Sequence, residues 1–195
     1  MRKVLGIMAV LCSFATAAGA GDFKLYGSYW DTTDVDDTFG GGLGFSIPLG
    51  TSPFAISLAG TYYQELSDQP LDNLFDPDES FFEEESLEVL PVDVGLQFNF
   101  PSNGPVSAWI EGGGTFFFID TTREGIDVDD ETGWHASVGS RFGQREGANF
   151  FAEAIYRSTE ATLVRNRRVN DVDLRDEVAI DLDGFAVNAG ILWHW

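Results

Sequence analysis

The feature that most constrains how this chain folds is an alternation of large apolar residues with small or polar residues, at a period of two. In segment 39–49 the odd positions carry Phe, Leu and Ile with a single Gly, whereas the even positions carry only Gly, Ser and Pro. A period of two is typical of a β-strand with one apolar face. Eight segments show the pattern, and each is near the length with which a tilted strand crosses a bilayer. They are 23–30, 39–49, 54–63, 90–100, 106–118, 134–142, 150–158 and 183–195.

The segments that connect these strands alternate between short turns and long acidic loops. The short turns, rich in Gly, Pro, Asn and Ser, are 50–53, 101–105 and 143–149; the long loops are 31–38, 64–86, 120–132 and 159–183. Outer-membrane barrels have short periplasmic turns and long outer loops in this order. The pattern predicts an all-β fold: a transmembrane antiparallel up-and-down β-barrel of about eight strands with both termini at the periplasmic rim. A soluble β-sandwich or lipocalin-like barrel, with the apolar face inward, is the alternative.

The N-terminal residues have the pattern of a secretory signal peptide. Two basic residues precede the apolar stretch 4–15, which is too short to span a membrane comfortably, and residues 18–20 fit a small-x-small cleavage site. We therefore expect a signal peptide at 1–20 and a barrel domain at 21–195. The single cysteine, Cys12, lies in the expected signal peptide, so the barrel domain contains no disulfide.

The composition argues against two classes of protein. The formal net charge is −21 at pH 7, whereas a nucleic-acid partner requires clustered Lys and Arg. A high net charge also occurs in disordered chains. However, the chain is 44% hydrophobic and 14% aromatic, which predicts a folded protein whose charge is segregated into its loops.

The face with small and polar residues also carries ionisable residues of both signs. They are Asp93, Glu111, Arg141, Glu153 and Arg157. In a barrel of about eight strands this face lines a narrow lumen that side chains fill. An unpaired buried charge there would cost several kcal/mol, so we expect these residues to pair across the lumen. Glu153 and Arg157 lie about 13 Å apart along one strand, which places their partners on other strands.

The last segment carries large apolar residues on one face and ends on a tryptophan. Its apolar face includes Phe185, Val187, Ile191, Trp193 and Trp195. With these residues and the pattern of strands and loops, the chain resembles the small eight-stranded outer-membrane proteins of Gram-negative bacteria, of the OmpA-transmembrane, OmpX and OmpW kind. Segments 42–50 and 54–63 also resemble YfaZ-type barrels.

That resemblance implies a location in the cell outer membrane, with membrane lipid and lipopolysaccharide as surroundings. It also implies that the barrel-assembly machinery reads the terminal strand. Most such proteins end in Phe, whereas this chain ends in Trp195. The oligomeric state is left open.

His135 and Ser137 are the weak candidates for catalysis, because a His and a Ser two apart on a strand point the same way. The pair is similar to the His-x-Ser of outer-membrane lipid A deacylases, which add a Glu; here Glu146 or Glu153 would fill that role. The chain departs from those enzymes because Val138 replaces their Asn, and because the pair faces the lumen rather than lipid. We therefore interpret the two residues as a polar pair that lines the lumen. We expect that the protein is not an enzyme; a deacylase-like esterase is the alternative.

The loops carry further candidate contacts. Arg165, Arg167 and Arg168 stand in an otherwise acidic loop, where they pair either with lipopolysaccharide phosphates or with acids of neighbouring loops. The acidic stretches 76–80 and 127–131 lack the spacing of an EF-hand. We expect no cofactor and no metal site beyond weak binding of divalent cations by the loops.

We expect a structural or surface-interaction role, with a polar, salt-bridged lumen and acidic loops outside. A narrow gated pore for small solutes is the alternative, in which the lumen charges exchange partners, as is proposed for OmpA-like barrels. Lateral passage of hydrophobic molecules, as in OmpW-like barrels, ranks lower because it requires an apolar lumen.

Overall fold

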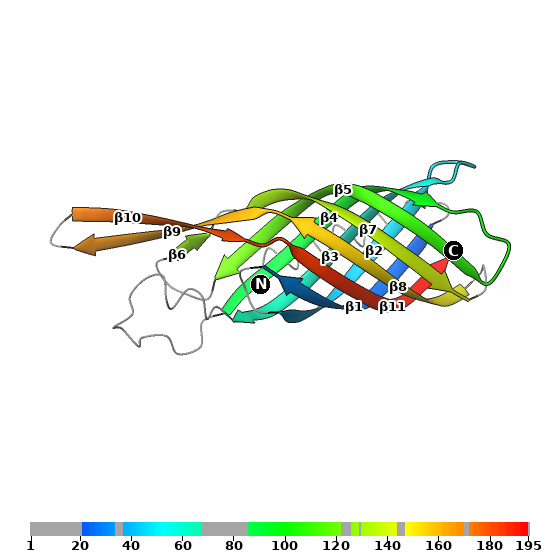
Figure 1. Cartoon of the computed structure of the whole chain (residues 1–195), viewed down its shortest axis with the longest axis horizontal. Helices are drawn as coiled ribbons and strands as arrows, with labels where there is room; N and C mark the ends of the chain where they lie inside the picture. Colours follow the sequence, from blue (N-terminus) through cyan, green and yellow to red (C-terminus); the bar gives the residue numbers. More distant parts are fainter. Residues whose placement is uncertain are drawn as a thin grey trace.

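The computed structural model describes residues 21–33, 37–67, 86–121, 126–128, 130–143, 147–169 and 172–194. The expected signal peptide and Trp195 lie outside these residues. Eight of the described strands form a closed antiparallel barrel, which confirms the predicted fold class (Figure 1). They are β1 (Asp22–Thr32), β2 (Thr38–Pro48), β3 (Phe54–Ser67), β4 (Ser86–Asn99), β5 (Val106–Thr121), β7 (Glu131–Phe142), β8 (Gly147–Ser158) and β11 (Gly184–His194).

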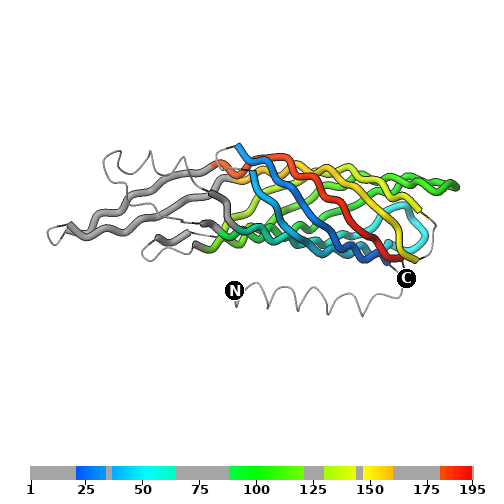
Figure 2. The backbone as a smooth tube through the Cα atoms, turned by 90° about the horizontal axis from the view of Figure 1, so that it is seen from below, coloured from blue at the N-terminus to red at the C-terminus, as the bar shows by residue number. Residues whose placement is uncertain are grey.

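Closure of the barrel brings the first and last strands together. β11 lies between β1 and β8, and its pairing with β1 runs from Asp22 opposite His194 to Thr32 opposite Gly184. Figure 2 shows the two strands side by side, in blue and red. The connections after β2, β4 and β7 are short, and Gly50 and Gly147 adopt positive φ angles of 64° and 84° there. We call this end of the barrel the short-turn end and the opposite end the long-loop end.

A second, three-stranded sheet lies at the long-loop end. It consists of β6 (Ile126–Val128), β9 (Glu160–Val169) and β10 (Val172–Asp181). β9 and β10 form a hairpin that extends away from the barrel (Figure 1). The sequence pattern predicts a loop over the whole of 159–183. This was wrong for the hairpin, whose Val, Leu, Ile and Thr residues favour strands even though acidic residues interrupt the alternation.

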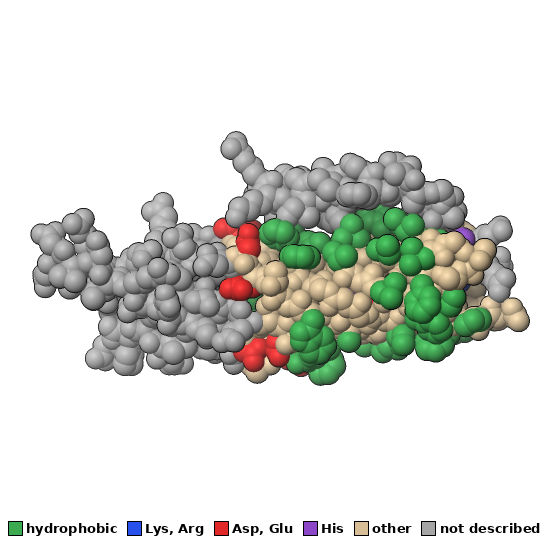
Figure 3. All heavy atoms as spheres, turned by 90° about the horizontal axis from the view of Figure 1, so that it is seen from above, with side chains coloured by type: hydrophobic (Ala, Val, Ile, Leu, Met, Phe, Trp, Pro, Cys, Tyr) green, Lys and Arg blue, Asp and Glu red, His purple; other side chains and the backbone are tan. Residues whose placement is uncertain are grey.

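The two faces of the barrel strands meet different surroundings, as the alternation predicts. On β7 the outward Val138 is 55% exposed, whereas the inward His135 is 2% exposed. The same alternation of exposed and buried residues runs along β8 and β11. Hydrophobic side chains are spread over the barrel exterior, and acidic side chains gather towards one end (Figure 3). An apolar exterior around a polar interior suits a barrel surrounded by lipid.

Glycines on the inner face make room for lumen aromatic rings. A Cβ atom added at Gly42 would lie 2.4 Å from the ring of Tyr26, and one added at Gly139 would lie 2.2 Å from the indole of Trp109. Real Cβ atoms do not approach that closely, so each ring fills the space that a side chain on the neighbouring wall would need. The narrow lumen is therefore closely packed.

Candidate functional site in the barrel lumen

A buried ion pair crosses the lumen between β8 and β4. Arg157 donates from Nη2 to Asp93 Oδ2 at 2.7 Å and from Nε to Asp93 Oδ1 at 3.2 Å. Thr115 adds a third donor to Asp93 at 2.7 Å. Arg157 is 0% exposed and Asp93 is 2% exposed, so water does not compete for these contacts. A bidentate arginine–carboxylate pair of this kind is a strong and directional link between two strands.

His135 connects this pair to a second carboxylate. Its Nδ1 lies 3.0 Å from Thr115 Oγ1 and 3.6 Å from Asp93, and its Nε2 lies 3.3 Å from Glu111 Oε1. Glu111 in turn accepts a hydrogen bond from Ser57 on β3. The imidazole therefore stands between two acidic groups and links β7 with β4 and β5.

A third carboxylate, Glu153 on β8, is surrounded by donors. Lys24 lies 3.4 Å from its Oε1, and Trp109 Nε1 and Ser137 Oγ donate to the same oxygen at 3.0 and 3.1 Å. Asn188 donates to Oε2 at 3.2 Å. The ammonium group of Lys24 also lies 4.5 Å from the Trp109 ring centre, in reach of a cation–π contact.

These groups form one layer of charge, which we call the lumen network. It contains the carboxylates Asp93, Glu111 and Glu153 and the basic groups Lys24, His135 and Arg157. The basic groups are two permanent cations and one imidazole. Each of these three carboxylates lies next to a basic group of the network. This pairing offsets the free-energy cost of burying the charges.

Buried aromatic side chains pack on both sides of the lumen network. Towards the short-turn end, Trp109, Phe151 and Leu192 pack with Tyr26 in a buried group that we call the aromatic cluster. Towards the long-loop end, the buried Trp30 ring lies 4.9 Å from Tyr63 and 6.3 Å from Phe117. Next to Asn188, the network leaves a cavity of only about 10 Å³, roughly the space of one water molecule.

The structure brings together four of the five residues expected to pair in the lumen: Asp93, Glu111, Glu153 and Arg157. Arg141 lies apart from them at the short-turn end, where its Nε donates to Ser107 at 3.1 Å and its Nη1 lies 3.9 Å from Asp22. Arg141 does not reach the network because it lies near the end of β7, on the short-turn side of the aromatic cluster. Lys24 and His135 are missing from the predicted network, although both lie on the inward parity and carry basic side chains.

His135 and Ser137 both face the lumen, as expected. Ser137 donates to Glu153, whereas both ring nitrogens of His135 have other partners, Thr115 and Glu111. The described contacts therefore place the two residues in separate branches of the network rather than as a joined nucleophile and base. Glu146, the other proposed third member, lies outside the described residues.

The remaining predicted residues lie on the last strands. Phe185, Val187, Ile191 and Trp193 occupy alternate positions of β11, and the exposed Trp193 stacks on Phe23 with ring centres 6.0 Å apart. Arg165, Arg167 and Arg168 belong to β9, but their side chains are outside the described part of the structure.

The described residues lack two kinds of feature. No group of three or more His, Cys, Asp or Glu side chains there is arranged to hold a metal ion. No described helix is long and apolar enough to cross a membrane.

Comparison with known proteins shows a likeness of fold. No family model and no curated protein matches the sequence. Among solved structures, the chain is similar to the outer membrane protein AlkL (TM-score 0.61, 11% identity, 91% of this chain and 90% of that chain covered). It is also similar to Neisserial surface protein A (TM-score 0.59, 9% identity, 90% and 96% covered) and to the E. coli outer membrane protein W (TM-score 0.52, 12% identity, 91% and 98% covered).

The fold and the lumen together define the class of protein. A closed barrel of eight strands, apolar outside and ionic inside, is the arrangement of a small outer-membrane β-barrel protein. The solved structures that share this fold are such barrels, in agreement with an outer-membrane location.

Proposed function

We propose that the protein is a closed outer-membrane scaffold that displays its acidic loops and the β9–β10 hairpin at the cell surface, where they contact other molecules. The observation that carries this proposal is the Asp93–Arg157 pair, which crosses the lumen with both groups buried. The aromatic residues on both sides of the lumen network support the same role, because a packed lumen holds the wall rigid but passes no solute. In such a protein the interacting parts are those that extend beyond the barrel.

A narrow gated pore is the second candidate function. One observation favours it: one basic group of the lumen network, His135, lies within reach of two carboxylates, Asp93 at 3.6 Å and Glu111 at 3.3 Å. Exchange of partners within such a layer would open a path without leaving a charge unpaired. Opening would also require the aromatic cluster to move.

Conductance of the purified protein in a planar lipid bilayer distinguishes the two functions. We expect no discrete current steps from wild-type protein whose folding is shown by heat-dependent gel mobility. Reproducible steps in the wild type would contradict the scaffold. If their size changed in Arg157→Ala but not in the matched variant Arg141→Ala, which lies outside the lumen network, the gated pore would replace it.

Three further contacts belong to the same proposal. Arg165, Arg167 and Arg168 contact lipopolysaccharide phosphates or the acids of neighbouring loops, and the acidic loops bind divalent cations weakly. The outward residues of β11, together with Trp195, form the signal read by the barrel-assembly machinery.

The same proposal gives His135 and Ser137 non-catalytic roles. A deacylase-like esterase that uses these two residues is the alternative.

A further inference from the structure

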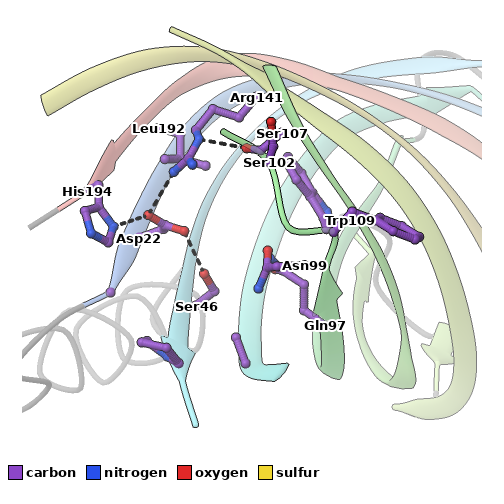
Figure 4. Close-up of a pocket in the computed structure, with 14 residues that line it drawn as sticks. Asp22, Ser46, Gln97, Asn99, Ser102, Ser107, Trp109, Arg141, Leu192 and His194 are labelled. Atoms are coloured by element: carbon purple, nitrogen blue, oxygen red, sulfur yellow. Dashed lines mark hydrogen bonds and ion pairs between the residues drawn. The ribbon is translucent and has the colours of Figure 1, made fainter. Parts of the chain in front are cut away.

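The short-turn end of the barrel contains a cavity of about 240 Å³, which we call the vestibule (Figure 4). Polar and apolar side chains both line it, and they come from the ends of the barrel strands β1, β2, β3, β4, β5, β7 and β11. Trp109 and Leu192 belong to this wall and also to the aromatic cluster that closes the lumen. The vestibule therefore borders the aromatic cluster, and none of the ionisable residues of the lumen network lines it.

Arg141 is the cation of the vestibule. Arg141 Nε donates to Ser107 at 3.1 Å, whereas the nearest carboxylate among the described residues, Asp22, is 3.9 Å from Nη1 and beyond hydrogen-bond distance. Asp22 instead accepts from His194 Nδ1 at 2.8 Å and from Ser46 at 3.4 Å (Figure 4). The guanidinium is thus oriented by one neutral partner, and its terminal nitrogens remain available to an anion in the fork geometry that carboxylates match.

Gln97, in the same wall, has a side-chain oxygen that accepts no hydrogen bond from the described residues. Its Nε2 donates to Asn99 at 2.6 Å, but its Oε1 is buried and has no hydrogen-bond partner among the described residues. The side chain is only 2% exposed, so the missing bond costs free energy. Reversing the amide would not remove this cost, because one polar atom of Gln97 would still lack a partner. A hydroxyl group that entered beside Gln97 would meet this requirement.

We propose that the vestibule binds a small monoanion that also carries hydroxyl groups, namely a sugar acid. Its carboxylate would lie at Arg141, and its hydroxyls would contact Gln97 and Asn99. A dianionic group such as phosphate fits less well, because its second charge would lie beside Asp22. This binding is separate from the proposed scaffold role, since the ionisable residues of the lumen network do not line the vestibule.

Calorimetric titration of the purified protein in lipid nanodiscs tests the proposal with three matched probes. D-glucuronate carries both required groups, D-glucose lacks the carboxylate, and cyclohexanecarboxylate lacks the hydroxyls. We expect saturable binding of D-glucuronate and at least about tenfold weaker binding of each other probe. Equal binding of all three, or no binding of D-glucuronate, would overturn the proposal.

Variants locate the binding. Arg141→Gln should weaken D-glucuronate binding by about tenfold or more and Gln97→Leu by about threefold to tenfold, because each removes one polar contact. Arg141→Lys keeps the charge and should recover part of the affinity, whereas Ser140→Ala, on the outer face beside Arg141, should change nothing. Nuclear magnetic resonance should show D-glucuronate shifting the Gln97 amide and Arg141 Nε signals. Unchanged affinity in folded Arg141→Gln protein, or unshifted signals at saturation, would refute the site.

Discussion

Arg157 and Arg141 are both inward arginines near the ends of their strands, but their surroundings differ. Arg157 is fully buried against Asp93, whereas Arg141 is partly exposed and loosely paired. Arg157→Gln leaves a buried carboxylate without its cation, so we expect the free energy of unfolding to fall by about 3–5 kcal/mol. Arg141→Gln should cost about 1 kcal/mol or less. Urea titration of the protein in lipid vesicles measures both, and equal losses would contradict the buried pair.

The glycines of the inner face give a second residue-scale prediction. Gly139→Ala places a methyl group against the Trp109 indole. The indole has to move, which disrupts the hydrogen bond from Trp109 Nε1 to Glu153. The expected loss is about 1–3 kcal/mol, the cost of overpacking. Gly27→Ala, on the outer face of β1, is the control, because nothing lies within 4 Å of a Cβ atom added there. Unfolding midpoints and tryptophan fluorescence should change for Gly139→Ala and stay unchanged for Gly27→Ala; the reverse order would argue against the observed lumen packing.

At the scale of single residues, the sequence determines which face a side chain occupies but not which neighbour it meets. The inward positions of Asp93, Glu153 and Arg157 follow from the period of two. The Asp93–Arg157 contact does not follow, because it depends on the register and tilt of strands that are far apart in the chain. For the same reason, Gly139 cannot be recognised from the sequence as the space for Trp109.

At the scale of elements, the β9–β10 hairpin is joined to the barrel by a narrow base. Leu182 N donates to Thr159 O at 3.1 Å, so the two ends of the hairpin already lie side by side. Replacing residues 160–181 with a short glycine-containing turn should therefore change the barrel's free energy of unfolding by no more than about 1 kcal/mol. Heat-dependent gel mobility and urea titration check this. Loss of the folded form would show that the hairpin is part of the barrel's own core.

Asp183 allows a second test of the contacts at the base of the β9–β10 hairpin. Its Oδ1 accepts from Thr159 N at 2.7 Å and its Oδ2 from Tyr156 at 3.1 Å. In the shortened protein, Asp183→Ala should cost about 1–2 kcal/mol, because it leaves the Thr159 amide without its acceptor. If the shortened protein tolerates this change without loss, then the base of the hairpin is not held as the structure shows.

The elements differ in how well the sequence predicts them. All eight barrel segments are predicted, because one face of each meets lipid and the alternation is correspondingly strict. β9 and β10 are missed because neither has a continuous apolar face, and their pairing rests on backbone hydrogen bonds that leave no periodic signal.

At the scale of the whole molecule, the exterior should behave as a surface in contact with lipid. Val138 and Phe142 share the outer face of β7, but Val138 lies nearer the middle of the barrel. Val138→Arg should reduce the stability in lipid vesicles by about 2–4 kcal/mol and Phe142→Arg by about 1 kcal/mol or less, because the cost of a charge falls from the bilayer midplane to its edge. Urea-dependent refolding measures the difference. Equal effects would mean that the apolar exterior does not follow the depth profile of a bilayer.

The seam between β1 and β11 sets the order of events when the molecule forms. Asp22 and His194 meet across it although 172 residues separate them in the sequence. Until β11 has been synthesised, β1 has one unpaired edge and the barrel cannot close. Closure of the barrel therefore has to follow the synthesis of the whole chain, and the pairing that closes it is also the one with the greatest loop entropy to overcome.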